Sequence, residues 1–86
     1  MNLFIGNLDY SIREQQLREL FEPYGEVTSA KVITDKMSGR SKGYGFVEMS
    51  NDAEGEQAIN ALNGQMVKNR NISVTQARPR PEGGNQ

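Results

Sequence analysis

Apolar and polar side chains alternate along four short segments of the chain, residues 2–6, 27–34, 43–49 and 71–77. A period of two is typical of a strand with one buried face, and β-branched residues, which favour strands, are frequent in 27–34. Residues 35–41 have the sequence DKMSGRS, a composition typical of a turn. We therefore predict four strands, of which the middle two form a hairpin with a long loop.

A first helical pattern follows the first strand. Ser11 and Glu14 have the spacing of a capping box, in which two side chains bond the free backbone groups at the start of a helix. Pro23 and Gly25 are residues that end helices. Between these signals, apolar residues occur at helical spacing: Ile12, Leu17, Leu20 and Phe21. We predict a helix with Ser11 as its N-cap that stops near Pro23.

A second helical pattern follows the third strand. Asn51 and Glu54 repeat the capping-box spacing, and Asn63-Gly64 is a typical helix end. The apolar residues between them are Ala53, Ala58, Ile59, Ala61 and Leu62. Gly55 weakens this helix, because glycine has a low helix propensity.

The predicted order is strand, helix, strand, strand, helix, strand. This order indicates an α+β fold of the ferredoxin-like β-α-β-β-α-β type, with a four-stranded antiparallel sheet. Right-handed crossovers place both helices on one face of the sheet and leave the other face open. We assign residues 1–78 to one domain and residues 79–86, which have no periodicity and no apolar residue, to a flexible tail.

The open face of the predicted sheet carries aromatic residues. In the first strand Leu3 and Ile5 point to the helices, so Phe4 points outward. In the third strand the residues with odd numbers, Gly43 to Met49, take the core side. Three residues of that strand, and Lys42 directly before it, then face outward: Lys42, Tyr44, Phe46 and Glu48. Three of the six aromatic residues would be exposed, which favours a contact surface. Alternatively, a partner helix or a dimer covers them, or the register differs and they belong to the core.

Composition excludes several kinds of chemistry. The chain has 86 residues and contains neither cysteine nor histidine. Disulfides, zinc sites built on these residues and Ser-His or Cys-His catalytic pairs are therefore excluded, and we expect no metal and no cofactor. No apolar stretch approaches the roughly 20 residues that span a bilayer, and no signal peptide is recognisable. The cytoplasm is the expected compartment.

The net charge of -1 argues at first against a nucleic-acid partner. However, eight of the ten basic residues lie in two segments, 31–42 and 68–80, in which Asp35 is the only acid. Together these segments would create a local positive field that the net charge conceals. Flat rings flanked by such cations suit single-stranded nucleic acid, because its bases offer free π-faces that a duplex does not.

Two segments resemble a known family. Residues 42–49, KGYGFVEM, agree at seven of eight positions with the octapeptide of the RNA recognition motif, K/R-G-F/Y-G/A-F-V-x-F/Y. Residues 3–8, LFIGNL, resemble its hexapeptide on the first strand. Met49 departs from the aromatic pattern, but it is predicted to face the core. The resemblance covers about residues 1–78 and extends to the small single-motif RNA-binding proteins of bacteria.

The resemblance implies roles for individual residues. Phe4 and Phe46 would each stack a base, Tyr44 would pack against sugars and Lys42 would pair with phosphate. Lys31 should also face outward, and the segment that follows the last strand usually crosses near the bases in this family. The predicted RNA-binding residues are Phe4, Lys31, Arg40, Lys42, Tyr44, Phe46, Gln76 and Arg78.

The predicted function is single-stranded RNA binding by a monomer, with a post-transcriptional or RNA-chaperone role and no small-molecule substrate. A protein-interaction module of the same fold is one alternative, although such modules usually lack the sheet aromatics. Single-stranded DNA binding is another, because stacking does not require the 2′-hydroxyl. An enzyme is disfavoured, since no paired acids fall within one motif.

Overall fold

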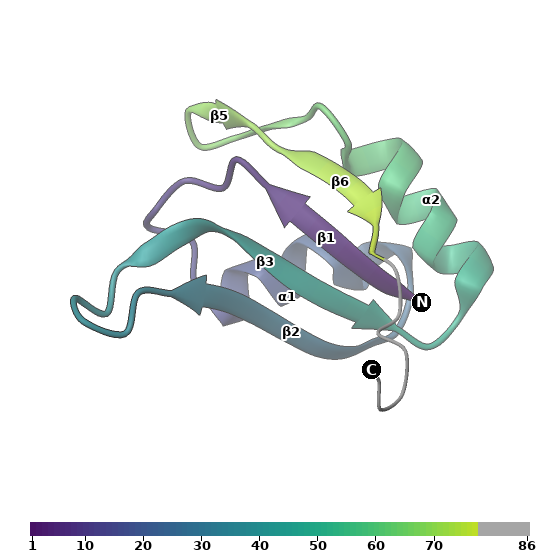
Figure 1. Cartoon of the computed structure of the whole chain (residues 1–86). Helices are drawn as coiled ribbons and strands as arrows, with labels where there is room; N and C mark the ends of the chain where they lie inside the picture. The colour runs from purple at the N-terminus through teal and green to yellow at the C-terminus, as the bar shows by residue number, and fades with distance from the viewer. Residues whose placement is uncertain (78–86) are drawn as a thin grey trace.

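The computed structural model describes residues 1–77 and contains a four-stranded sheet with two helices behind it (Figure 1). The four strands of this sheet are β1 (Asn2–Gly6), β2 (Val27–Thr34), β3 (Ser41–Met49) and β6 (Ser73–Gln76). The helices are α1 (Glu14–Phe21), which continues into the short 3-10 helix η1 (Glu22–Tyr24), and α2 (Asp52–Leu62). Two two-residue strands, β4 (Met66–Val67) and β5 (Arg70–Asn71), form a separate small hairpin.

The sheet has the order β2-β3-β1-β6, and every neighbouring pair is antiparallel. Both helices cover the same face, and the opposite face is open in Figure 1. The predicted ferredoxin-like α+β fold is therefore confirmed. Within residues 1–77, no helix is both long enough and apolar enough to cross a membrane.

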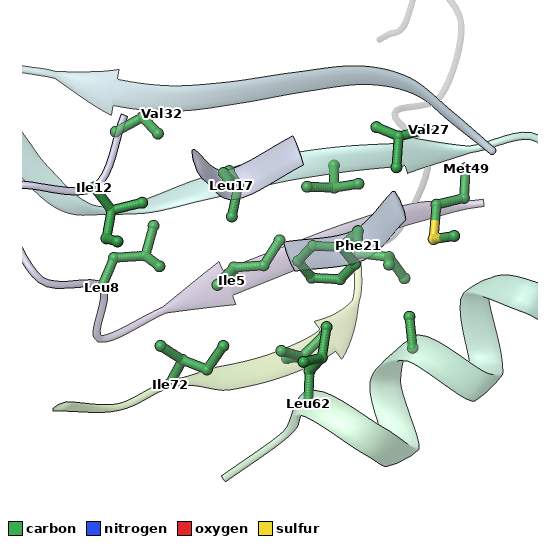
Figure 2. Close-up of a cluster of buried hydrophobic side chains, with 14 residues drawn as sticks. Ile5, Leu8, Ile12, Leu17, Phe21, Val27, Val32, Met49, Leu62 and Ile72 are labelled. Atoms are coloured by element: carbon green, nitrogen blue, oxygen red, sulfur yellow. The ribbon is translucent and has the colours of Figure 1, made fainter. Parts of the chain in front are cut away.

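The hydrophobic core fills the space between the sheet and the helices (Figure 2). Leu3 and Ile5 of β1 and Val74 of β6 are completely buried, as are Leu17 and Phe21 of α1. The full core set is Leu3, Ile5, Leu8, Ile12, Leu17, Phe21, Val27, Val32, Val47, Met49, Ala58, Leu62, Ile72 and Val74. Its strand members follow the predicted period of two, which fixes which side chains remain for the open face.

The start of α1 differs from the sequence prediction. The helix begins at Glu14 with Arg13 as its N-cap, and the backbone N–H of Arg13 donates to Oε1 of Gln16 at 2.8 Å. Ser11 is instead held by Asp9, whose Oδ1 accepts from the Ser11 N–H at 2.9 Å and from its hydroxyl at 2.7 Å. The prediction that Ser11 is the N-cap was wrong because the Asp9 carboxylate, two residues before, organises Ser11 into a turn.

The start of α2 agrees with its prediction in part. Oδ1 of Asn51 accepts from the backbone N–H of Glu54 at 2.9 Å, so Asn51 is the N-cap. The Glu54 carboxylate does not complete a capping box but accepts from the N–H of Glu26 at 3.4 Å. After Leu62 the chain turns through Gly64, whose φ of 86° lies in the region that favours glycine.

The predicted strand 71–77 is divided in the structure. Asn71 pairs with Met66 in the small β4-β5 hairpin, and β6 begins only at Ser73. Between them Ile72 is buried, and its N–H donates to the carbonyl of Gln65 at 2.9 Å. A lysine with φ of 58°, Lys68, makes the turn of the hairpin. The alternation of apolar residues continues from Asn71 through Ser73. It therefore does not show where the chain stops pairing with β4 and begins to pair with β1.

Candidate nucleic-acid interface

Three aromatic rings lie together on the open face of the sheet. The ring centroid of Phe4 is 5.5 Å from that of Phe46 and 5.7 Å from that of Tyr44, and the ring planes are inclined by 62° and 37°. Phe46 is 39% exposed, whereas Val47, the next residue, is 1% exposed. Phe4 and Tyr44 are half-buried. We call these three residues the aromatic platform.

The register of the sheet continues the platform across all four strands. Phe4 lies opposite Phe46 on β3 and opposite Thr75 on β6. Phe46 in turn lies opposite Lys31 on β2. Lys31 and Thr75 are both exposed, so an ammonium group ends the row on one side and a hydroxyl ends it on the other.

Two glycines allow the close packing around this row. A side chain on Gly45 would overlap the carbonyl oxygen of Lys31, because β2 and β3 approach closely there. A Cβ atom on Gly6 would lie 3.2 Å from the Phe4 ring and 2.8 Å from the Ser73 hydroxyl. Glycine at these positions weakens strand propensity but leaves room for the neighbouring strand and for the ring.

Lys42 and Arg40 lie where the β2-β3 loop enters β3, and both are exposed. Asp35 organises that loop, since its Oδ1 accepts from the N–H groups of Met37 at 2.7 Å and Ser38 at 3.2 Å. These two backbone hydrogen bonds lower the pKa of Asp35, so its carboxylate is bound to the loop itself. Asp35, the only acid in the basic segment 31–42, is therefore paired with backbone N–H groups of its own loop.

The end of β6 has a different orientation from the platform. Gln76 lies opposite the buried Leu3, so by alternation its side chain belongs to the helix side of this edge strand, where it is exposed. The N–H of Ala77 donates to the carbonyl of Asn2 at 2.8 Å. The structure thus does not bring the Gln76 side chain onto the platform. Arg78 and the predicted tail, 79–86, lie outside the described residues.

A second group of side chains, which the sequence reasoning left out of the site, gathers at the end of β1. The guanidinium carbon of Arg70 lies 5.1 Å from the ring centroid of Tyr10, and its Nη1 donates to Oδ1 of Asn7 at 3.0 Å. Nδ2 of Asn7 donates to the carbonyl of Asn71 at 2.8 Å. We call Asn7, Tyr10 and Arg70 the sheet-end cluster. Its sequence signal was weak: one aromatic residue within a polar turn.

The sequence matches the RNA recognition motif family over residues 3–73. The chain belongs to the RNA recognition motif family. The match covers both motif segments and the elements α1, β2 and α2 around them, so the resemblance carried by residues 3–8 and 42–49 is confirmed.

Relatives of this RNA recognition motif occur in bacteria and plants. RbpE of Nostoc sp., whose name describes it as an RNA-binding protein, is 43% identical over 84 residues, which are 98% of this chain and 85% of the relative. The glycine-rich RNA-binding protein blt801 of Hordeum vulgare is 43% identical over 94% of this chain, which spans 50% of that protein.

Solved structures share the same fold. The crystal structure of the RNA-binding protein PG1 is 47% identical with a TM-score of 0.91, and the match covers 94% of this chain and 98% of that one. A Sex-lethal protein–RNA complex is 32% identical with a TM-score of 0.87, over 94% of this chain and 48% of that chain. The recognised fold is therefore one that is found in complexes with RNA.

Proposed function

We propose that this protein binds single-stranded RNA through the open face of its sheet. The observation that carries the proposal is the aromatic platform: Phe46 is 39% exposed and its ring lies 5.5 Å from that of Phe4 on the next strand. Exposed rings on a rigid sheet provide stacking surfaces for bases, each worth roughly 1 to 3 kcal/mol. The names of the relatives RbpE and blt801 support RNA as the ligand.

The inclination of the rings favours an unpaired strand. Phe4 and Phe46 are inclined by 62°, so bases lying flat on both rings could not be parallel to each other. Bases in a duplex are parallel and have no free faces. A strand bound here would have to be splayed, as in a loop or a single-stranded segment.

The polar groups around the platform suit the sugar-phosphate backbone. In this proposal Phe4 and Phe46 each stack a base, and Tyr44 packs against the sugars. Phosphates would pair with three exposed cations: Lys31, which lies opposite Phe46, and Arg40 and Lys42, which lie where the β2-β3 loop enters β3. Gln76 and Arg78 remain proposed contacts at the chain end, with Gln76 acting at the edge of the sheet instead of on its face.

We also propose that residues 1–78 are the binding unit and that the protein acts as a monomer in the cytoplasm. A post-transcriptional or RNA-chaperone role fits a module that holds unpaired RNA. Single-stranded DNA and a protein partner are the competing ligands, and the test compares DNA with RNA directly.

The test is selection from a random single-stranded RNA pool, followed by titration of the selected sequence as RNA, as DNA and as a duplex. We expect the RNA strand to bind most tightly and the duplex most weakly. Phe46→Ala should weaken binding of the RNA. Met66→Ala removes an exposed apolar side chain from the separate β4-β5 hairpin, which is not part of the four-stranded sheet. This variant should leave binding unchanged. Equal binding of RNA by Phe46→Ala and the unmodified protein would contradict the proposal.

A further inference from the structure

The two outer strands of the sheet, β2 and β6, each pair with only one neighbour (Figure 1). Each therefore has a free edge, along which backbone N–H and C=O groups point away from the sheet. A free edge can pair with a strand of another copy of the chain, which leads to self-association. On both edges, however, one of these backbone groups is bonded to a side chain from a helix or a helix end.

The free edge of β2 is bonded by Arg18 of α1. Nη1 of Arg18 donates to the carbonyl of Val27 at 2.9 Å, and the contact is partly buried. Met49, which faces Val27 in the register, bonds in the opposite direction: its N–H donates to the Met1 carbonyl at 2.9 Å, and its carbonyl accepts from the Met1 ammonium at 2.7 Å. The backbone groups of Val27 therefore point away from β3, and Arg18 occupies an acceptor on the free edge.

The rest of the β2 edge is poorly suited to pairing. Its register with β3 is irregular between Val27 and Ser29 and again between Val32 and Thr34. Lys31, in the regular part between these irregularities, is exposed. Irregular register and an exposed lysine both hinder the addition of a further strand. Arg18 adds to these features at the end where β2 begins.

The free edge of β6 is bonded by Asn63, directly after α2. Oδ1 of Asn63 accepts from the N–H of Val74 at 3.0 Å, and β6 has β1 as its one partner strand, so this N–H lies on the free edge. Directly before β6, the N–H of Ile72 donates to the Gln65 carbonyl at 2.9 Å, and its carbonyl accepts from the N–H of Gly64 at 2.8 Å. Since β6 has four residues, these bonds cover the start of its edge.

We propose that Arg18 and Asn63 keep the chain monomeric by occupying the free edges of the sheet against pairing with a second copy. We call these two residues the edge caps. A strand added at a capped position must first break an existing hydrogen bond, so it gains little from the one that it forms. This inference rests on the monomer of the proposed function and assigns the residues that maintain it, and it does not depend on RNA.

The experiment measures molecular mass against protein concentration by analytical ultracentrifugation, without RNA. The unmodified protein should stay monomeric across the range. The double variant Arg18→Met, Asn63→Ala should associate about tenfold more tightly or more, because a pair of uncapped edges forms additional backbone hydrogen bonds. Each single variant opens one edge and tests it separately, so each cap is tested even if the double variant does not fold. Thermal melting establishes that each variant is folded.

Two kinds of control accompany these variants. Arg18→Lys retains a cationic donor and Asn63→Asp retains an acceptor, so both should remain closer to the monomeric unmodified protein than Arg18→Met and Asn63→Ala. Arg13→Met and Asn60→Ala repeat the disruptive substitutions at exposed positions beside or within the same helices. These two variants should stay monomeric, because neither residue bonds a free edge.

Hydrogen exchange at single amides identifies the surface that pairs. The backbone of Met49 bonds toward β1, so that of Phe46, an odd number of residues away, bonds toward Lys31 on β2. The N–H groups on either side of Lys31, those of Ala30 and Val32, then point to the free edge.

These edge amides should respond to the loss of their own cap. In Arg18→Met, exchange at Ala30 and Val32 should slow as the protein concentration rises. In Asn63→Ala, exchange at Val74 should slow in the same way, because its N–H is released for pairing with a second copy. The unmodified protein should show no such dependence on concentration at any of the three amides.

The outcomes separate this inference from the proposed RNA binding. Folded variants that remain as monomeric as the unmodified protein overturn it. Association without slower exchange at the edge amides also overturns it, because another surface would then be responsible, as does equal association of Arg13→Met and Asn60→Ala. If the unmodified protein associates through its edges, the proposed monomer fails with the inference. Failure of the unmodified protein to bind RNA in the titration described above would refute the RNA proposal and leave the edge caps untouched.

Discussion

The two faces of the sheet use the same strands for different purposes. On the covered face, Leu3 and Val47 are 0% and 1% exposed and pack against α1 and α2. On the open face, their neighbours in sequence, Phe4 and Phe46, lie side by side without any helix over them. Burial stabilises the folded chain in proportion to the apolar area removed from water, so the covered face should determine stability. Side chains on the open face become buried only when a ligand binds, so the open face should determine binding.

The largest expected effect is on the covered face. Leu3→Ala should lower the free energy of unfolding by about 2 to 5 kcal/mol, because it leaves a cavity at a fully buried position. Chemical denaturation measures this loss, and RNA titration of the folded fraction should give an affinity close to that of the unmodified protein. A loss of affinity in well-folded Leu3→Ala protein would show that the two faces are not separable.

The comparison is sharpest between Phe46 and Val47, which are adjacent in β3 and face opposite sides. Phe46→Ala should cost roughly 1 to 3 kcal/mol of RNA binding, about five- to 150-fold, with little loss of stability. Val47→Ala should destabilise the fold by about 1 to 3 kcal/mol while the folded protein still binds. Thermal midpoints and RNA titrations of both variants measure the two effects. The aromatic platform is refuted if Phe46→Ala melts the protein and leaves the affinity of the folded fraction intact.

These faces were predictable from the sequence because a strand places successive residues on opposite sides regardless of what surrounds it. The first turn of α2 was predictable for a similar reason, since Asn51 and Glu54 are three residues apart and interact within one helical turn. Prediction of the α1 start failed where two local signals competed, and the carboxylate of Asp9 bound Ser11.

The sheet-end cluster was not predictable in this way. Arg70 and Asn7 are 63 positions apart in the chain, and they meet only because β6 pairs with β1 and the β4-β5 hairpin precedes β6. The same distinction applies to Gln76: its place at the end of the last strand suggested a contact, but its face depends on the register with Leu3. Local patterns predicted the platform, whereas the sheet-end cluster depends on long-range pairing.

Salt should distinguish the ring contacts of the open face from its charge contacts. If about three phosphates are paired at a slope of roughly 0.7 each, the logarithm of the binding constant should fall with the logarithm of salt concentration at a slope of about -2. Lys42→Gln should bring this slope closer to zero by roughly 0.7, since one cation is lost. Phe46→Ala should lower the affinity and keep the slope. A slope near zero in the unmodified protein would refute the electrostatic contacts.

The smallest expected effect concerns the one acid on the open side of β3. Glu48 is exposed two residues beyond Phe46, and its carboxylate should repel a phosphate backbone that lies on the platform. Glu48→Gln removes this charge and keeps the shape of the side chain, so RNA affinity should rise by about twofold at low salt and by less at high salt, where the charge is screened. Titrations at two salt concentrations measure the change. The matched control is Glu56→Gln, the same substitution at an exposed position of α2 on the helix side, which should have a smaller effect at both concentrations because it lies farther from the bound strand. If Glu48→Gln instead weakens binding while Glu56→Gln does not, the carboxylate accepts a hydrogen bond from a base amino group, and the open face reads bases as well as stacking them.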